Sequence, residues 1–212
     1  MKHEKSTSLF QYWNRLRGNR PAPKRTEIEP ADIKANLADT FILEQDTRGR
    51  PMFRLASTRL CATFGRELKG FAFEALWREA DRGIALRLAH SAFSADSVVI
   101  VSLSGRSAGG RECEFELVML PLEGGLDHRR LLGSIAPLER PFWLGADAVV
   151  ECRIETLRVI DPDREPYLLA NRPPIPTPPL SPAAAGEFEP LGTQDGTRRI
   201  RHLLVIEGGK EE

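Results

Sequence analysis

The sequence has little cysteine and no excess of charge of either sign. Its 212 residues include three widely spaced cysteines, Cys61, Cys113 and Cys152. Their spacing forms no CxxC pair and no Cys/His set typical of zinc, and their odd number does not indicate a secreted disulfide framework. Thirty Lys and Arg residues balance thirty Asp and Glu residues, so the formal net charge is zero. This balance argues against a nucleic-acid surface, and we expect no nucleic-acid partner.

Long apolar runs are also missing. Residues 1–8 are charged and polar, and no apolar run of signal-peptide length follows them. Nowhere do 18 apolar residues occur consecutively, so we expect no membrane insertion. Together with the cysteine pattern, these features predict a cytoplasmic protein.

Recognisable catalytic motifs are missing as well. The sequence contains no GxSxG, HExxH, Walker loop or GxGxxG motif, and its histidines are scattered at positions 3, 90, 128 and 202. Glu114 and Glu116 belong to an alternating segment in which we expect both carboxylates to face solvent. We therefore predict no catalytic residues, no metal site and no enzymatic activity.

The hydrophobic pattern that is present predicts an α+β fold. Period-two alternation and β-branched runs indicate strands, and wider apolar stripes indicate helices. The expected strands are 40–45, 52–57, 97–103, 113–119 and 130–137, and the expected helices are 58–64, 71–77 and 80–94. This order places three helices between the second and third strands. It predicts a five-stranded antiparallel sheet with the helices gathered on one face.

A flanking segment, residues 1–37, precedes this domain. Leu9, Trp13 and Leu16 are spaced as one face of a helix over about residues 7–18, and Phe10 adds a further aromatic side chain. Such a short helix needs a surface to pack against. Two interpretations stay open: these four residues dock on the protein's own sheet, or they form an interface between two copies.

The C-terminal part has a different composition. Residues 38–145 are expected to form the domain, and residues 146–196 a Pro-rich linker that is largely extended or disordered, because prolines are frequent and large apolar residues are few after residue 160. In the tail, residues 197–212, the apolar run 201–207 predicts a short strand. It could add to a sheet edge in the same chain or in a partner.

The predicted strand order is that of the PAS fold. Trp13 and the segments 17–44, 53–77 and 131–145 resemble a PAS-like family of regulators found mainly in alphaproteobacteria, although Ser57 stands where a glycine is expected. The resemblance implies a stand-alone sensory or regulatory module in signalling that binds a small ligand or an unknown signalling protein. It also implies a homodimer, because flanking helices of PAS proteins often mediate dimerisation.

The resemblance places a ligand pocket between the sheet and the helices. The inward apolar positions expected to line it are Phe53, Leu55, Phe64, Phe73, Leu88, Val101, Phe115 and Leu132. His90 joins them because it lies on the helix that carries the proximal histidine in haem-binding PAS proteins. No haem or flavin is expected, since the segment around Cys61 lacks the flavin-sensor motif and nothing else suggests iron. An unknown small molecule could fill the pocket. The alternatives are an adaptor protein with a filled core and, third, a small-molecule-converting enzyme.

Overall fold

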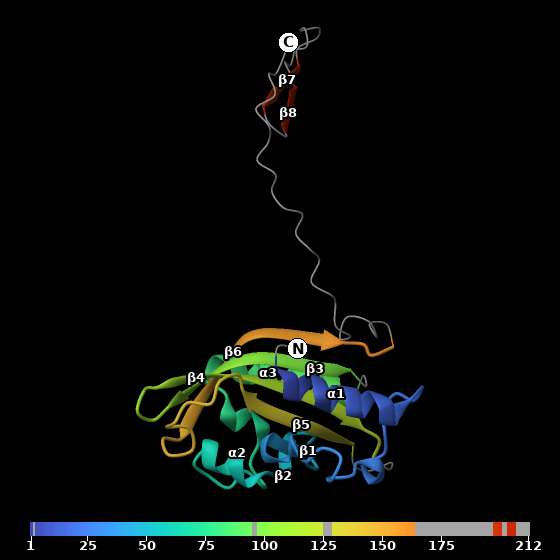
Figure 1. Ribbon diagram of the computed structural model, residues 1–212, viewed down its shortest axis with the longest axis vertical. Helices are drawn as coiled ribbons and strands as arrows, with labels where there is room; N and C mark the ends of the chain where they lie inside the picture. Colours follow the sequence, from blue (N-terminus) through green and yellow to red (C-terminus); the bar gives the residue numbers. More distant parts are fainter. Residues whose placement is uncertain (2, 95–96, 125–128, 164–196, 201–202, 207–212) are drawn as a thin grey trace. The chain divides into compact units, whose positions relative to one another are not determined.

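The computed structural model describes residues 1, 3–94, 97–124 and 129–163, and the backbone of residues 197–200 and 203–206 (Figure 1). The chain divides into two compact units, Met1–Arg172 and Pro173–Glu212. In the second unit, β7 (Thr197–Ile200) pairs with β8 (Leu203–Ile206) in an antiparallel hairpin, so part of the strand expected at 201–207 is present. No helix among the described residues is long and apolar enough to cross a membrane.

The first unit contains an antiparallel sheet of six strands in the order β2-β1-β5-β4-β3-β6. The α+β class and the five expected strands are confirmed, and one further strand extends the sheet beyond β3. The strands are β1 (Thr40–Gln45), β2 (Pro51–Ala56), β3 (Val98–Ser107), β4 (Glu112–Leu122), β5 (Arg130–Pro137) and β6 (Val149–Ile160).

Helices cover both faces of this sheet. One face carries α2 (Thr58–Thr63), the 3-10 turn η3 (Phe73–Leu76) and α3 (Glu79–Ser94), as the sequence predicts, and the opposite face carries α1 (Glu4–Arg17) (Figure 1). Short 3-10 turns, η1 (Arg25–Glu27) and η2 (Leu37–Asp39), lead from α1 to β1. Two apolar cores result, one on the α3 side and one on the α1 side.

The α1 helix docks on its own sheet. Leu9 and Trp13 are fully buried and Phe10 is 5% exposed, while Leu16 is partly buried against the same core. The indole Nε1 of Trp13 donates a hydrogen bond to the carbonyl oxygen of Pro121 at the end of β4, at 2.6 Å. Of the two interpretations of this segment, the structure shows the first, in which the apolar face of α1 packs on the chain's own sheet.

Strand β4 is buried on both faces at its C-terminal end. Cys113, Phe115, Leu117 and Met119 face the α3 side, as the alternation predicts. The opposite face begins with Glu112 and Glu114, which are exposed, but continues with Val118 and Leu120 in the α1-side core. Glu116 is only 1% exposed, because α1 covers it, and it accepts a hydrogen bond from the backbone N–H of His3 at 3.1 Å. The expectation that Glu116 faces solvent is therefore wrong.

Strand β6 corrects the predicted linker at 146–196. It pairs with β3 along its length, with Cys152 opposite Gly105 and Ile154 opposite Leu103. The side chains of Cys152 and Ile154 both pack in or against the α3-side core. Residues 149–160 therefore belong to the sheet rather than to a linker. The rest of the predicted linker, 164–196, lies outside the described residues.

Candidate functional site

Six of the nine residues expected to line a pocket do meet between the sheet and α3. Phe53, Phe64, Phe73, Leu88, Val101 and Phe115 all belong to the α3-side core, and none is more than 7% exposed. Five of them belong to β2, η3, α3, β3 and β4, and Phe64 directly follows α2. These six side chains therefore face the interior between the sheet and the helices, as the apolar pattern predicts.

Aromatic rings pack against one another in this region. The ring centroids of Phe41 and Phe53 lie 5.3 Å apart, and that of Phe73 lies 6.5 Å from Phe41 and 6.0 Å from Phe53. Trp77 continues the cluster with an edge-on contact to Phe73 at 5.7 Å. These separations are those of directly contacting aromatic pairs. These four rings therefore contact one another within the α3-side core, where the sequence predicted a pocket.

Leu55 and Leu132 are not part of this core, which corrects two of the predicted pocket residues. An irregularity in the β1–β2 pairing shifts the register between Ile42 and Leu43, so that Phe53 lies opposite Leu43 while Leu55 lies opposite Ile42. A β-bulge of this kind turns the following side chain to the other face, and Leu55 is 51% exposed. Leu132 also faces the α1 side, in the core that contains Ile42.

His90 is also outside the core. Its side chain is exposed on α3, and its Nε2 lies 3.0 Å from the carbonyl oxygen of Gly49 in the β1–β2 turn. Because a carbonyl oxygen only accepts, Nε2 must carry the proton in this contact. His90 therefore links α3 to the hairpin turn instead of facing a ligand.

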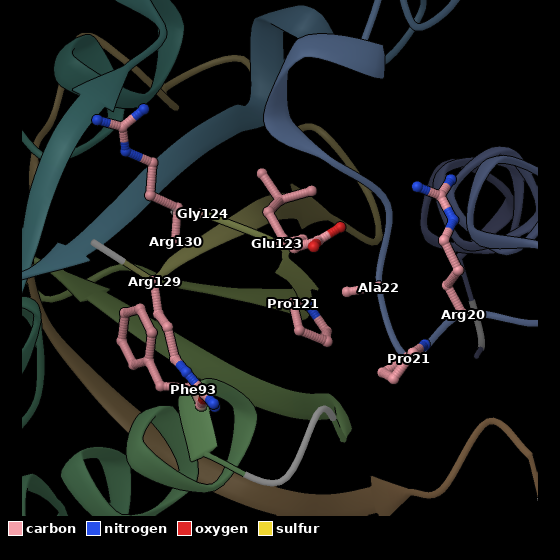
Figure 2. Close-up of a pocket in the computed structure, with 10 residues that line it drawn as sticks. Arg20, Pro21, Ala22, Phe93, Pro121, Glu123, Gly124, Arg129 and Arg130 are labelled. Carbon is pink, nitrogen blue, oxygen red and sulfur yellow. The ribbon is translucent and has the colours of Figure 1, made fainter. Parts of the chain in front are cut away.

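A cavity of about 260 Å³ lies at one end of the sheet (Figure 2). The chain that follows α1 forms one side of it, with Arg20, and the start of β5 forms the other, with Arg129 and Arg130 (Figure 2). The end of β4 lies between them. The remaining lining residues are Pro21, Ala22, Phe93, Pro121, Leu122, Glu123 and Gly124.

Each arginine of this cavity already has a partner. Arg20 makes a two-pronged contact with the carboxylate of Glu27, at 3.0 and 2.9 Å. Arg129 donates to the carbonyl oxygens of Phe93 and Ser94 at the end of α3, where exposed carbonyls favour a cation. Arg130 lies 3.5 Å from the carboxylate of Glu44. These contacts join the N-terminal segment, α3 and the sheet.

A larger groove, of about 470 Å³, lies where β4 begins and β5 ends. Beside it, in the β5–β6 connection, Phe142 is 94% exposed while its neighbour Trp143 is buried. The guanidinium of Arg111 lies 5.9 Å from the centroid of the Phe142 ring. The groove is lined by Glu112, Cys113, Glu114, Leu138, Glu139, Arg140 and Pro141. The sequence interpretation missed this site, although the adjacent Phe and Trp in a Pro- and Gly-containing loop were a signal for it.

The buried thiols are poorly suited to chemistry. Burial raises the pKa of Cys113 to about 11 and that of Cys152 to about 12, so both are protonated at neutral pH. Among the residues that the structure describes, no group of three or more His, Cys, Asp or Glu side chains could hold a metal ion.

Comparison with known protein families identifies a family with this architecture. Residues 1–136 match the model of the PAS domain, a span that includes α1 and the sheet through β5. The chain belongs to the PAS domain family. No curated protein matches it. Because the match begins at residue 1, the α1 helix on the sheet of this PAS domain falls within the family's own boundaries.

Proposed function

We propose that this PAS domain is a non-catalytic regulatory module of the cytoplasm that acts by binding a partner protein in a signalling pathway. The observation that carries the proposal is the aromatic cluster of Phe41, Phe53, Phe73 and Trp77 in the α3-side core. A haem or a flavin would need this volume, so we expect neither cofactor there.

The surface around Phe142 supports a partner-binding role. Aromatic side chains dominate the energetics of many interfaces and are enriched in them, and the exposed ring of Phe142 lies beside a groove. The adjoining groove carries the carboxylates of Glu112, Glu114 and Glu139 and a single cation, Arg140. This charge favours a partner with a basic surface and an apolar pocket that receives the Phe142 ring.

The proposal is tested with three full-length proteins, the wild type, Phe142→Ala and Phe71→Ala. Phe71 is 43% exposed and provides a matched control for loss of an exposed aromatic ring. Each is used to capture proteins from the source cells, and the captured protein is then purified and titrated against all three. We expect binding to the wild type and to Phe71→Ala, and at least tenfold weaker binding to Phe142→Ala, the loss typical of an interface anchor.

Equal affinities for all three proteins would overturn the role of Phe142. A tightly bound metabolite, flavin or haem in the native mass spectrum of the freshly purified protein would favour a ligand sensor instead. A homodimer that dissociates with Phe142→Ala would identify the partner as a second copy of the chain.

A further inference from the structure

A second charged cavity, of about 220 Å³, lies near the start of α1. It is formed by the first residues of the chain, η2, α2, the start of β4, the end of β5 and the β5–β6 connection. Its lining residues are His3, Lys5, Asp39, Arg59, Thr63, Phe115, Ile135, Pro137, Leu138, Arg140 and Leu144. It is separate from the cavity at the other end of β4 in Figure 2, with which it shares no lining residue.

Cations outnumber anions in this cavity. The side chain of Asp39 is only 3% exposed, and one of its oxygens, Oδ2, accepts from both Lys5 Nζ and Arg59 Nη2 at 2.7 Å. The buried carboxylate therefore holds these two cations side by side. Arg140 adds a third cation, so the lining has an excess of two positive charges when His3 is neutral.

Several donors of these cations have no partner. An ammonium group has three N–H donors and a guanidinium five, and the contacts of Lys5 and Arg59 use only part of them. The guanidinium of Arg140 has no hydrogen bond or ion pair with any described residue. An anion entering the cavity could therefore accept hydrogen bonds without breaking the contacts to Asp39.

Part of the cavity lining is apolar. Phe115, Ile135 and Leu144 form this part and are 1%, 2% and 8% exposed, and all three belong to the α3-side core. A water molecule occupies about 30 Å³ of the liquid, so the cavity volume corresponds to roughly seven waters. A ligand of about seven to ten non-hydrogen atoms with one anionic end and one apolar end matches both parts of the lining.

We propose that this cavity binds a small organic carboxylate. Its carboxylate lies among Lys5, Arg59 and Arg140, and its apolar part lies against Phe115 and Leu144. This site goes beyond the partner binding proposed above, although it shares Leu138 and Arg140 with the groove beside Phe142. Because Lys5 belongs to the first turn of α1, the bound carboxylate also stabilises the docking of that helix on the sheet.

The test uses the full-length protein and two probes of equal size, hexanoate and its neutral analogue hexanamide, with inorganic phosphate as a third. Binding is followed by calorimetry and by shifts of backbone amide signals in NMR spectra. We expect hexanoate to bind and to shift the amides around Lys5 and Arg59, and hexanamide to bind at least tenfold more weakly. Arg140→Gln should weaken hexanoate binding about three- to tenfold, because its cation is partly exposed.

Arg48→Gln is the matched control, since it removes an exposed cation in the β1–β2 turn and should leave hexanoate binding unchanged. Lys5→Gln gives an independent second variant, which should also weaken binding. Equal binding of hexanoate and hexanamide, or no effect of either variant, would overturn the proposal. Phosphate binding as tightly as hexanoate would overturn the role of the apolar part of the lining.

Discussion

The ring of Phe41 in β1 occupies the space that a Cβ atom on Gly133 of β5 would need. The two residues lie directly opposite each other in the antiparallel pairing of β1 with β5. Phe41 is fully buried and is also part of the aromatic cluster with Phe53 and Phe73. The absence of a side chain at Gly133 therefore determines where the ring lies and how the centre of the α3-side core is filled.

Gly133→Ala should destabilise the protein by about 1–3 kcal/mol, because the added methyl group forces Phe41 out of its position in a packed core. Gly83→Ala is the control. Its Cβ would meet only the flexible end of Arg87, at 3.5 Å, and alanine favours a helix over glycine by about 0.5–1 kcal/mol. Urea unfolding should show opposite signs for the two variants. A neutral result for Gly133→Ala would contradict the packing described.

Trp13→Ala should destabilise the protein by about 3–5 kcal/mol, because it removes a fully buried ring and its hydrogen bond to Pro121. If the face of α1 were an interface between copies, the variant would change the oligomeric state with little effect on the stability of each copy. Phe142→Ala should leave stability within about 0.5 kcal/mol of the wild type, since the ring is exposed. Thermal unfolding and sedimentation together separate these outcomes.

The Asp81 carboxylate joins α3 to β6, and it should make the free energy of unfolding depend on pH in the acid range. The hydrogen bond from Arg78, at 2.8 Å, and that from the backbone N–H of Ile154, at 2.9 Å, lower the pKa of Asp81 in the folded protein. Its unfolded pKa is about 3.9. Because the folded pKa is the lower one, the stabilisation is complete well above pH 4 and is lost as the pH falls through the folded pKa.

Asp81→Asn should therefore cost about 1–3 kcal/mol near neutral pH and progressively less below about pH 4. Urea unfolding at a series of pH values measures this difference from the wild type. Asp32→Asn, at an exposed acid in the segment before η2, is the control and should differ little from the wild type at any pH. A loss that does not change with pH would show that packing rather than charge explains the effect of Asp81→Asn.

The three thiols should differ in reactivity. With pKa values of about 11 and 12, Cys113 and Cys152 have on the order of one thiolate per thousand molecules or fewer at pH 8, and both are buried. Cys61 is only partly buried. Iodoacetamide at pH 8 should modify Cys61 first, as judged by peptide mass spectrometry, and all three in guanidinium chloride. Modification of Cys152 as fast as Cys61 in the native protein would contradict its burial.

A chain that ends after residue 163 should fold, whereas one that ends after residue 145 should not. Removal of β6 exposes the edge of β3. It also removes the buried side chain of Cys152 from the α3-side core and that of Ile160 from the α1-side core. Exposed edges of apolar strands promote aggregation. Circular dichroism and size-exclusion chromatography of the two truncated proteins would distinguish them. A folded, monomeric chain ending at residue 145 would show that β6 is dispensable.

The strands and helices with a clear apolar period could be predicted from the sequence, whereas features set by neighbours could not. β5 was predicted at its observed bounds, but Leu132 was assigned to the wrong face, because a one-residue shift in register reverses every side chain of a strand. Leu55 was misplaced because a bulge in the pairing with β1 has no periodic signature. β6 was missed because an edge strand exposes many polar side chains, such as Arg153 and Glu155.

The candidate sites also depend on neighbours in space that the sequence pattern does not reveal. Periodicity identified inward residues such as Phe53 and Phe73. Whether their rings touch or leave a space depends on side-chain volumes and on Gly133 in β5, a strand that pairs with β1 but is far from it in the sequence. Lys5, Asp39, Arg59 and Arg140 are far apart in the sequence and match no motif. Only the docking of α1 on the sheet brings the first of them to the others.

The guanidinium of Arg17, at the C-terminal end of α1, donates to the carboxylate of Asp163 at 2.7 Å and to the carbonyl oxygen of Pro162 at 3.1 Å. It also lies over the ring of Trp13, with 5.4 Å between its Cζ and the ring centroid. The place where the chain leaves the sheet is thus tied to the flanking helix. A force that pulls on the chain beyond Asp163 would therefore act on α1, through Arg17, as well as on β6.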